Sequence, residues 1–398
     1  MKTSKSPRTV LLVAYAIGLD VFDAYAHPCS PKKFTQPQLF ACLVLKTFFN
    51  ADYRGIVHIL NDLPGLCQTI GLETVPHYTT LQKAARRLLC EPRSVLLLNT
   101  TVRWFMQRRK QIQYAAIDSS GFDTTHASRY YVWRAKRMGF PRKHMTYRRF
   151  GKLSLICDCH NHLIVAAMTC RGPTPDVNQL QKTFARCSSH VSIQRLVADA
   201  GYDSESNHVF LREQLRIRSV IPPKHGRPSK DGKPPSGRYR RMMKRSFDRT
   251  SYKHRSQIET VFSMIKRNLG SCLSARSYWS KNREMNLKVI THNIMIVYDS
   301  IGFLQSECPL YSLPPCSLRF FSFSALAFAF SAWRRACRFA IEPLAICFWA
   351  SSFNRVGIIS SYQASYLRFI SAMSSGYCAA ILLVSPGSVR WSKRQNPS

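Results

Sequence analysis

Apolar residues in the first third of the chain recur at helical spacing, whereas later ones form short uninterrupted runs. Over residues 34–110 apolar side chains stand three or four positions apart, as in amphipathic helices that share one core. Pro64 and Pro76 interrupt these helices. The pattern predicts a helical, possibly DNA-binding domain over residues 34–110, preceded by an N-terminal extension over residues 1–33.

From residue 111 the spacing changes to that of β-strands. Residues 113–117 form a short apolar run that ends on Asp118, and residues 193–198 form another that ends on Asp199. Functional sites are often built at strand ends, although a single aspartate there is more often an ordinary turn residue. The two aspartates are therefore candidates for a shared site.

Two further runs, residues 152–159 and 162–169, predict an antiparallel hairpin. Strand and helix patterns then alternate as far as residue 300. This order predicts an α/β fold in which a mixed sheet is flanked by helices, formed by residues 111–300. Within it, residues 222–253 are rich in Pro, Gly, Lys and Arg, which predicts a mobile basic loop.

Beyond residue 300 the periodicity is lost. Phe, Ser, Ala and Cys dominate residues 301–398, and the apolar run at 320–333 is shorter than a membrane-spanning helix. We expect this segment to be a poorly structured tail, and we expect no membrane partner.

The net charge of the chain indicates the class of partner that it binds, which the pattern of helices and strands does not. Its 58 Lys and Arg residues outnumber 21 Asp and Glu, giving a formal net charge of +37. Such an excess favours a nucleic acid over an anionic membrane as the partner. Fourteen cysteines at irregular spacing in a chain of this size favour reduced thiols over a disulfide framework. A cytoplasmic location is therefore expected.

Basic residues are interleaved with aromatic ones between residues 128 and 152, where no acidic residue occurs. Cations and aromatic rings together suit a phosphate backbone and unstacked bases, although a solvated loop is the alternative interpretation. The candidate DNA contacts in this block and in the predicted basic loop are Arg134, Arg137, Arg148, Arg240 and Arg241.

A helix predicted over residues 252–266 carries a carboxylate flanked by cations. Offsets of four and seven residues place Arg255, Glu259 and Lys266 on one face, beside an apolar stripe. If folding brings this face to Asp118 and Asp199, three carboxylates repel one another unless cations neutralise them. Hard oxygen ligands of this kind select Mg²⁺ or Mn²⁺.

Two such ions would activate a water or a 3′-hydroxyl and stabilise the leaving oxygen of a phosphodiester. Arg255 and Lys266 would then bind the neighbouring phosphates. Other carboxylates compete for this role, and Asp203 is the strongest rival because it lies four residues after Asp199. We interpret Asp203 as a turn residue or helix cap.

Tyr252, Arg255, Glu259 and Lys266 fit the pattern Y-x2-R-x3-E-x6-K, the glutamate signature of the insertion-sequence DDE transposases. The stretch AIDSSG at 116–121 resembles the first-aspartate motif of this family. The stretch VADAGYDS at 197–204 resembles the second, and all three occur in the order of the family. The resemblance covers residues 34–300.

This resemblance implies an RNase H-like catalytic core that cuts and joins DNA at the ends of its own mobile element. It implies a triad that holds two Mg²⁺ or Mn²⁺ ions, formed by Asp118, Asp199 and Glu259. It implies contacts with transposon-end DNA by Tyr252, Arg255 and Lys266.

The partners implied are terminal inverted repeats, target DNA and a second protomer in the synaptic complex. The protein is then expected to be nucleoid-associated. Two alternatives are a nuclease on the same core that hydrolyses without joining, and a catalytically defective, DNA-binding transposase remnant.

Overall fold

The computed structural model describes residues 3–106, 111–124, 137, 150–188, 191–223 and 237–301. All of them belong to the first of two compact units, Met1–Pro315 and Cys316–Ser398. Residues 302–398 of the predicted tail lie outside the described residues, and so do residues 224–236 of the predicted basic loop.

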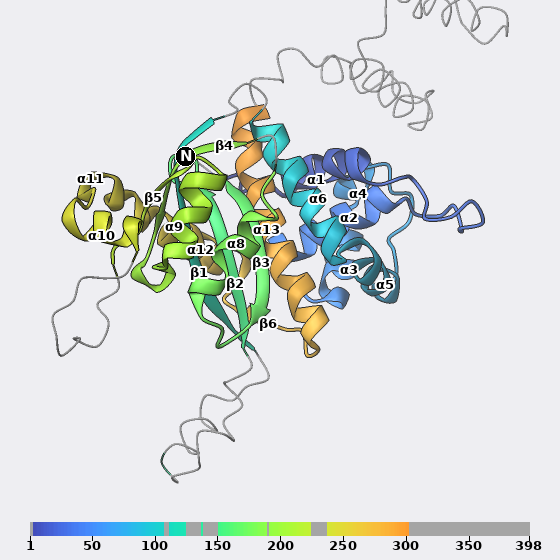
Figure 1. Cartoon of the computed structure of the whole chain (residues 1–398). Coiled ribbons are helices and arrows are strands. Elements are labelled where there is room, and N and C mark those ends of the chain that lie inside the picture. The colour runs from blue at the N-terminus through green and yellow to red at the C-terminus, as the bar shows by residue number, and fades with distance from the viewer. Residues whose placement is uncertain are drawn as a thin grey trace, which may run out of the picture. The chain divides into compact units, whose positions relative to one another are not determined.

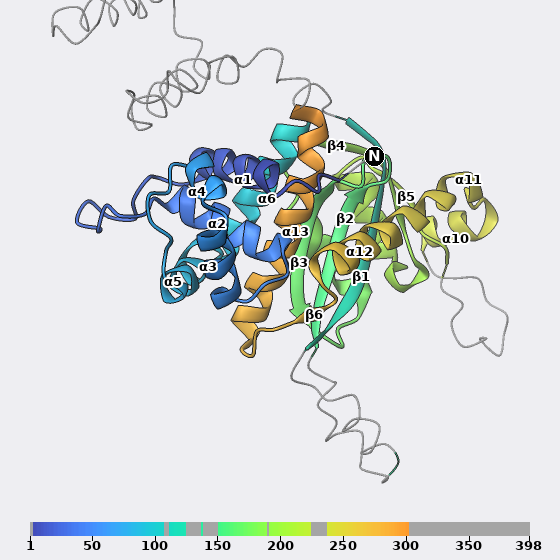
Figure 2. The same ribbon diagram turned by 180° about the vertical axis from the view of Figure 1, so that it is seen from behind.

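A mixed sheet forms the centre of the fold (Figures 1 and 2). Its strands are β1 (Gln111–Thr124), β2 (Gly151–Asp158), β3 (Ile164–Arg171), β4 (Ser192–Ala198), β5 (Arg218–Val220) and β6 (Cys272–Leu273). Their order is β3-β2-β1-β4-β5, and β6 pairs with the end of β1. β2 is antiparallel to β1 and β3, whereas β4 is parallel to β1 and β5. The predicted α/β class, a mixed sheet flanked by helices, is confirmed, and so is the hairpin.

Helices precede the sheet in the chain and cover both of its faces. Those before the sheet are α1 (Pro7–Val21), α2 (Gln36–Phe48), α3 (Tyr53–Asp62), α4 (Pro64–Thr69), α5 (Tyr78–Leu88) and α6 (Glu91–Phe105). The later ones are α8 (Leu180–Phe184), α9 (Glu205–Val209), α10 (Arg238–Arg245), α11 (Arg249–Tyr252), α12 (Ser256–Leu269) and α13 (Tyr278–Ile301). Across the part of the chain that the structure describes, no helix combines the length and apolarity needed to cross a membrane.

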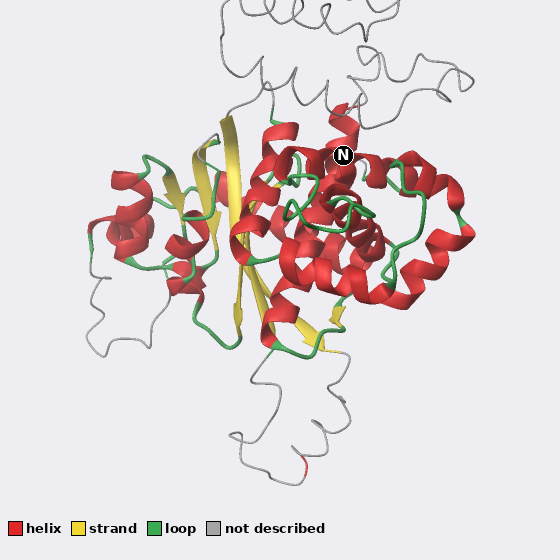
Figure 3. Ribbon diagram, turned by 90° about the vertical axis from the view of Figure 1, so that its right-hand side faces the viewer, coloured by secondary structure: helices red, strands yellow, loops and turns green. Residues whose placement is uncertain are grey.

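Side-chain alternation along β1 separates two cores. Ala116 and Phe122 pack with α12, α13 and the N-terminal helices, whereas Ala115 and Ile117 pack with α8 and with the turn that carries Tyr202. Figure 3 shows the sheet from its side, with helices on both faces. From residue 114 onward, a side chain at an even-numbered position of β1 is therefore directed toward the core that contains α12.

β1 does not end at Asp118, as the sequence had predicted. Its pairing with β4 ends at Ile117 and Ala198, but its pairing with β2 continues to Phe122 and Gly151. The continued ladder with β2 satisfies the backbone beyond Asp118, so no turn is needed there. Asp118 thus lies where β1 loses its β4 neighbour.

The predicted basic loop at 222–253 is also wrong in its second half, which is helical. α10 begins after Gly237, where Glu205 accepts hydrogen bonds from the amides of Tyr239 and Arg240 at 3.0 and 3.1 Å. Asp248 caps α11 by accepting from the amide of Ser251 at 2.9 Å. Carboxylates from other parts of the chain, and not local spacing alone, stabilise these short basic helices.

Asn293 of α13 joins three elements through one fully buried side chain. Its amide donates to the carbonyl of Ile164 in β3 at 2.8 Å and to Thr101 Oγ1 in α6 at 2.9 Å. Its Oδ1 accepts from the amide of Ile164 at 3.0 Å. The side chain therefore supplies both hydrogen bonds that the first residue of β3 requires.

We predict that Asn293→Ala lowers the free energy of unfolding by about 2–4 kcal/mol, because it leaves buried backbone groups of Ile164 without partners. Asn286→Ala, in the same helix but partly exposed, should cost about 1 kcal/mol or less. Urea unfolding followed by circular dichroism measures both. Equal losses would show that Asn293 has no special role in joining the helices to the sheet.

Candidate active site

Asp118 and Asp199 directly follow the last paired residues of β1 and β4. Ile117 is opposite Ala198 in a parallel ladder, so each aspartate is the next residue along neighbouring strands. Neighbouring strands lie about 4.8 Å apart, and opposed residues point to the same face of the sheet. The two carboxylates therefore lie side by side on the face that α12 covers.

α12 runs along β1 and brings Glu259 to the level of the first aspartate. Just before α12 begins, the ring of His254 stacks on Tyr114, with centroids 4.1 Å apart. Near its end, Lys266 Nζ donates to Ser120 Oγ at 2.7 Å. Glu259 lies between these contacts along the helix, just as position 118 lies between them along the strand.

Arg255 joins the carboxylates of two elements. It donates to Glu259 Oε1 at 2.7 Å, and its Nε lies 3.9 Å from Asp199 Oδ1, which is too far for a hydrogen bond. This Nε is shielded from solvent and has no hydrogen-bond partner among the described residues. Burial disfavours the charged guanidinium, but the Glu259 hydrogen bond and the Asp199 charge outweigh it, so the pKa of Arg255 is raised.

Asp118 is the carboxylate of this group that burial affects most clearly. Burial raises the pKa of Asp118, while the hydrogen bond from the amide of Ser119 at 2.7 Å and the charge of Arg255 oppose the rise. The charges of Asp176 and Asp199 raise the pKa further. A cation bound here would relieve both the desolvation and the repulsion.

Asp176 is a member of this charged group that the sequence did not reveal. It begins a single 3-10 turn (Asp176–Asn178) without capping it, and its Oδ1 lies 2.6 Å from Lys152 Nζ. In the sequence it simply precedes an apolar segment, as an ordinary helix-capping aspartate would. Its proximity to Asp118 depends on how β2 and the turn after β3 pack, for which no local pattern exists.

Asp203, the strongest rival of Asp199, is occupied elsewhere. Its side chain is fully buried, whereas that of Asp199 is 49% exposed. Arg240 holds Asp203 Oδ2 through Nη2 at 2.8 Å and through Nε at 3.0 Å. His208 Nε2 lies 3.6 Å from the other oxygen. Asp203 ends the 3-10 turn formed by residues 200–202, as the turn interpretation predicts, while Ser204 caps α9. The side chain of Asp203 belongs to a structural ion pair.

The cationic residues predicted to contact DNA lie in different surroundings. Arg240 is directed inward, toward Asp203, whereas Arg241 and Arg137 are exposed. Tyr252 is partly buried, which raises its pKa, and the charges of all three candidate carboxylates act on it, so it lies at this site. Arg134 and Arg148 lie outside the described residues.

The donor set is of the kind that Mg²⁺ or Mn²⁺ prefers, since Asp118, Asp199 and Glu259 offer only carboxylate oxygens. Within the described ranges, however, no three His, Cys, Asp or Glu side chains are arranged to hold one ion. Arg255 instead supplies the positive charge beside Asp199 and Glu259. The residues fit a divalent cation in kind, provided that Arg255 releases Glu259.

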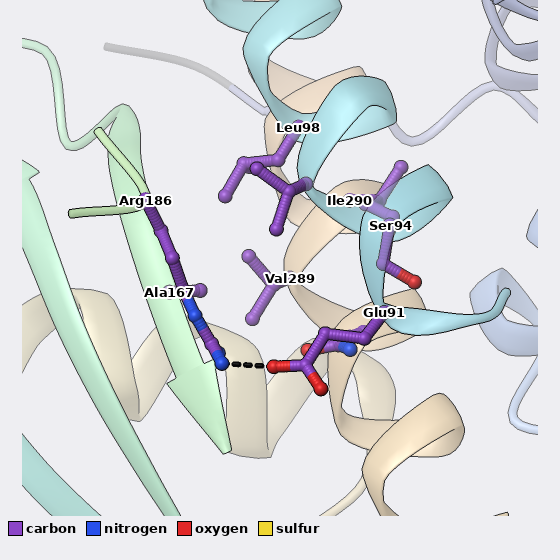
Figure 4. Close-up of a pocket in the computed structure, with 9 residues that line it drawn as sticks. Glu91, Ser94, Leu98, Ala167, Arg186, Val289 and Ile290 are labelled. Atoms are coloured by element: carbon purple, nitrogen blue, oxygen red, sulfur yellow. Dashed lines mark hydrogen bonds and ion pairs between the residues drawn. The ribbon is translucent and has the colours of Figure 1, made fainter. Parts of the chain in front are cut away.

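A pocket elsewhere in the molecule is lined by α6, β3 and α13 (Figure 4). Its lining is largely apolar, and its two charged side chains, Glu91 and Arg186, form an ion pair with each other. None of the candidate carboxylates lines it. It therefore offers no alternative centre for the chemistry considered above.

We predict that Arg240→Gln lowers the free energy of unfolding by about 3 kcal/mol, because it leaves the buried Asp203 carboxylate without its main cation. Arg241→Gln, the neighbouring exposed position, should change it by about 0.5 kcal/mol or less. Thermal and urea unfolding of both variants test this. If the two variants are equally stable, the Asp203 pair contributes nothing to the fold.

Comparison with known families agrees with this arrangement. Residues 109–294 match a family model described as the transposase DDE domain, and the matched range contains Asp118, Asp199 and Glu259. A comparison with curated proteins gives no match. The chain is also similar to a chain in the cryo-EM structure of a piggyBac transposase synaptic complex with hairpin DNA. There the identity is 10% and the TM-score 0.39, covering 98% of this chain and 88% of that chain, and so low a score does not establish a shared fold.

Proposed function

We propose that the chain is a DNA transposase that cleaves and joins the ends of its own element. The match of residues 109–294 to a family model of the transposase DDE domain supports this proposal and agrees with the resemblance seen in the sequence. One observation carries this proposal. Asp118 and Asp199 follow an in-register pair of parallel strands, and Arg255 links Asp199 to Glu259 on the helix that covers them.

In this proposal Asp118, Asp199 and Glu259 hold two Mg²⁺ or Mn²⁺ ions. When bound, such ions activate a water or a 3′-hydroxyl and stabilise the leaving oxygen of a phosphodiester. The partly buried Asp118 and the more exposed Asp199 present their carboxylates from neighbouring strands, so the backbone ladder fixes their spacing. The rigid α12 holds the third carboxylate at the same level.

Arg255 would change partners during this process. Without a bound cation, its guanidinium neutralises Glu259 and lies beside Asp199. Once the carboxylates have a cation, the guanidinium is free to bind a phosphate, for which its planar fork of donors is suited. Its Nε, which has no hydrogen-bond partner among the described residues, could donate to such a phosphate once the guanidinium moves into contact with it. Tyr252 and Lys266 would contact the same DNA strand.

The partners proposed are the terminal inverted repeats of an insertion sequence and its target DNA, bound by a homodimer in a nucleoid-associated, cytoplasmic complex. The formal charge of +37 supports a polyanionic partner. A nuclease on the same core, or a defective DNA-binding remnant, remains the alternative.

We predict that Asp118→Asn, Asp199→Asn and Glu259→Gln each reduce Mg²⁺-dependent cleavage of labelled end DNA by about 10³-fold or more, while DNA binding persists. Asp123→Asn, an exposed position of the same strand, is the matched control and should cleave normally. Gel assays of cleavage and of DNA binding measure both properties.

Joined products in this assay support a transposase, whereas cleaved but unjoined DNA supports the nuclease. Normal cleavage by Asp199→Asn together with loss of cleavage by Asp203→Asn would reassign the second carboxylate. Specific DNA binding by a wild-type protein that never cleaves would support the defective remnant.

We predict that Lys266→Ala weakens binding to end DNA and lowers the slope of log K against log salt by about one, since one phosphate contact is lost. The neighbouring Arg267→Ala is the control, because its side chain is exposed and lies away from Ser120. Fluorescence anisotropy over a salt series gives both slopes. An unchanged slope for Lys266→Ala would mean that this side chain contacts only the protein.

A further inference from the structure

α10 is a basic helix whose inner and outer faces have different environments. Its sequence, RYRRMMKR, contains no acidic residue. Met243 is buried and Arg240 is directed inward, on one side of the helix. The outer face, as we use the term, is formed by the exposed cations of the helix, which are Arg241 and, three or four positions from it, Arg238, Lys244 and Arg245. None of them forms an ion pair with an acidic residue in the described part of the chain.

Three acidic residues from earlier segments hold the inner face. Asp203 binds Arg240 bidentately, Glu205 accepts from the first amides of α10, and Glu213 accepts from the hydroxyl of Tyr239 at 2.9 Å. These carboxylates accept hydrogen bonds from the inner face and from the N-terminal amides of the helix, but within the residues that the structure describes they make no ion pair with its exposed cations. The outer cations are therefore held in place but not neutralised.

We call the three carboxylates that hold α10, those of Asp203, Glu205 and Glu213, the anchor. The backbone at Gly237 packs directly against one of them. Gly237 has a φ of +100°, and a side chain there would collide with the carboxylate of Glu205. Behind the anchor, His208 Nδ1 is 2.7 Å from Ser219 Oγ in β5, and Arg212 Nε donates to the same oxygen at 2.8 Å. A buried polar network thus connects α10 with the edge of the sheet.

The anchor begins close to the candidate active site. Asp203 lies four residues after Asp199, so at most about 14 Å of chain separates them. α11 then leads from α10 directly to Tyr252 and Arg255. Figure 1 shows α10 and α11 beyond β5, at the edge of the sheet that β4 and β5 form.

We infer that α10 is a docking helix for duplex DNA, whose phosphates bind to Arg241, Lys244 and Arg245 on its outer face. The inference rests on the proposed function and extends it, because it adds a binding surface beside the carboxylates and makes Arg240 a positioning residue. α10 is about 12 Å long, and duplex DNA carries one charge per about 1.7 Å of its axis. Arg241 lies one turn before the adjacent pair Lys244 and Arg245, so the three cations cover a length of helix that spans several phosphates.

The test compares two variants that lose the same charge. In the first, Arg241, Lys244 and Arg245 are all changed to Gln. In the second, the control, Arg8, Lys32 and Lys33 are changed to Gln, since these exposed cations lie in and near the N-terminal helices. Fluorescence anisotropy with a labelled 30-base-pair duplex gives log K against log salt for each protein, and circular dichroism checks that each is folded.

The α10 variant is expected to lose two to three units of slope, about 0.9 for each phosphate contact, and to bind about ten-fold or more weakly at 0.1 M salt. The control is expected to keep the wild-type slope within about half a unit. A slope for the α10 variant equal to that of the control would overturn the inference. Equal losses in both variants would also overturn it, since they would reflect net charge alone.

Mg²⁺-dependent cleavage by the wild type and by the α10 variant separates this inference from the proposed function. For the α10 variant, the DNA concentration required for half-maximal cleavage should increase at least about ten-fold, in line with its weaker binding. An unchanged DNA requirement would overturn the inference. A wild type that does not cleave would refute the proposed activity, while the salt slopes would still decide whether α10 binds DNA.

Discussion

The carboxylates of Asp118, Asp199 and Glu259 carry like charges, and the need to offset such charges is the constraint to which the neighbouring residues respond. The parallel ladder of β1 and β4 places two of them on neighbouring strands, and α12 adds the third. Arg255 bonds to Glu259 and lies near Asp199, so one guanidinium offsets charge from two elements. Burial has already raised the pKa of Asp118, which makes this centre receptive to a further cation.

Other acidic residues near the site have cations of their own. Asp203 is bound by Arg240 and Asp176 by Lys152. Because these carboxylates are neutralised by fixed partners, they are less available to a mobile ion than Asp199 is, with its half-exposed side chain and a guanidinium 3.9 Å away. Asp199 therefore differs from Asp203 and Asp176 in having no cation within hydrogen-bond distance among the described residues.

The long β1 strand connects the fold with the site. One face of β1 packs against helices that follow the catalytic segments, and the other packs against α8 and the turn after β4. Since α13 also bonds to β3 and to α6 through Asn293, the helices that come first in the chain are joined to the same sheet. The positions of the three carboxylates consequently depend on contacts made far from them.

The sequence by itself determined the elements whose signal is local. Apolar runs predicted β2, β3 and β4, and helical spacing predicted α12 with Arg255, Glu259 and Lys266 on neighbouring turns. Motif spacing also indicated the resemblance that the match of residues 109–294 to a transposase DDE domain model supports. Only the tertiary structure decided that β1 continues past Asp118, that residues 238–252 are helical, and that Arg240 is directed inward toward Asp203. Each of these depends on a partner strand or an opposite charge from a distant segment, and interactions through space leave no periodic pattern in the residues that make them.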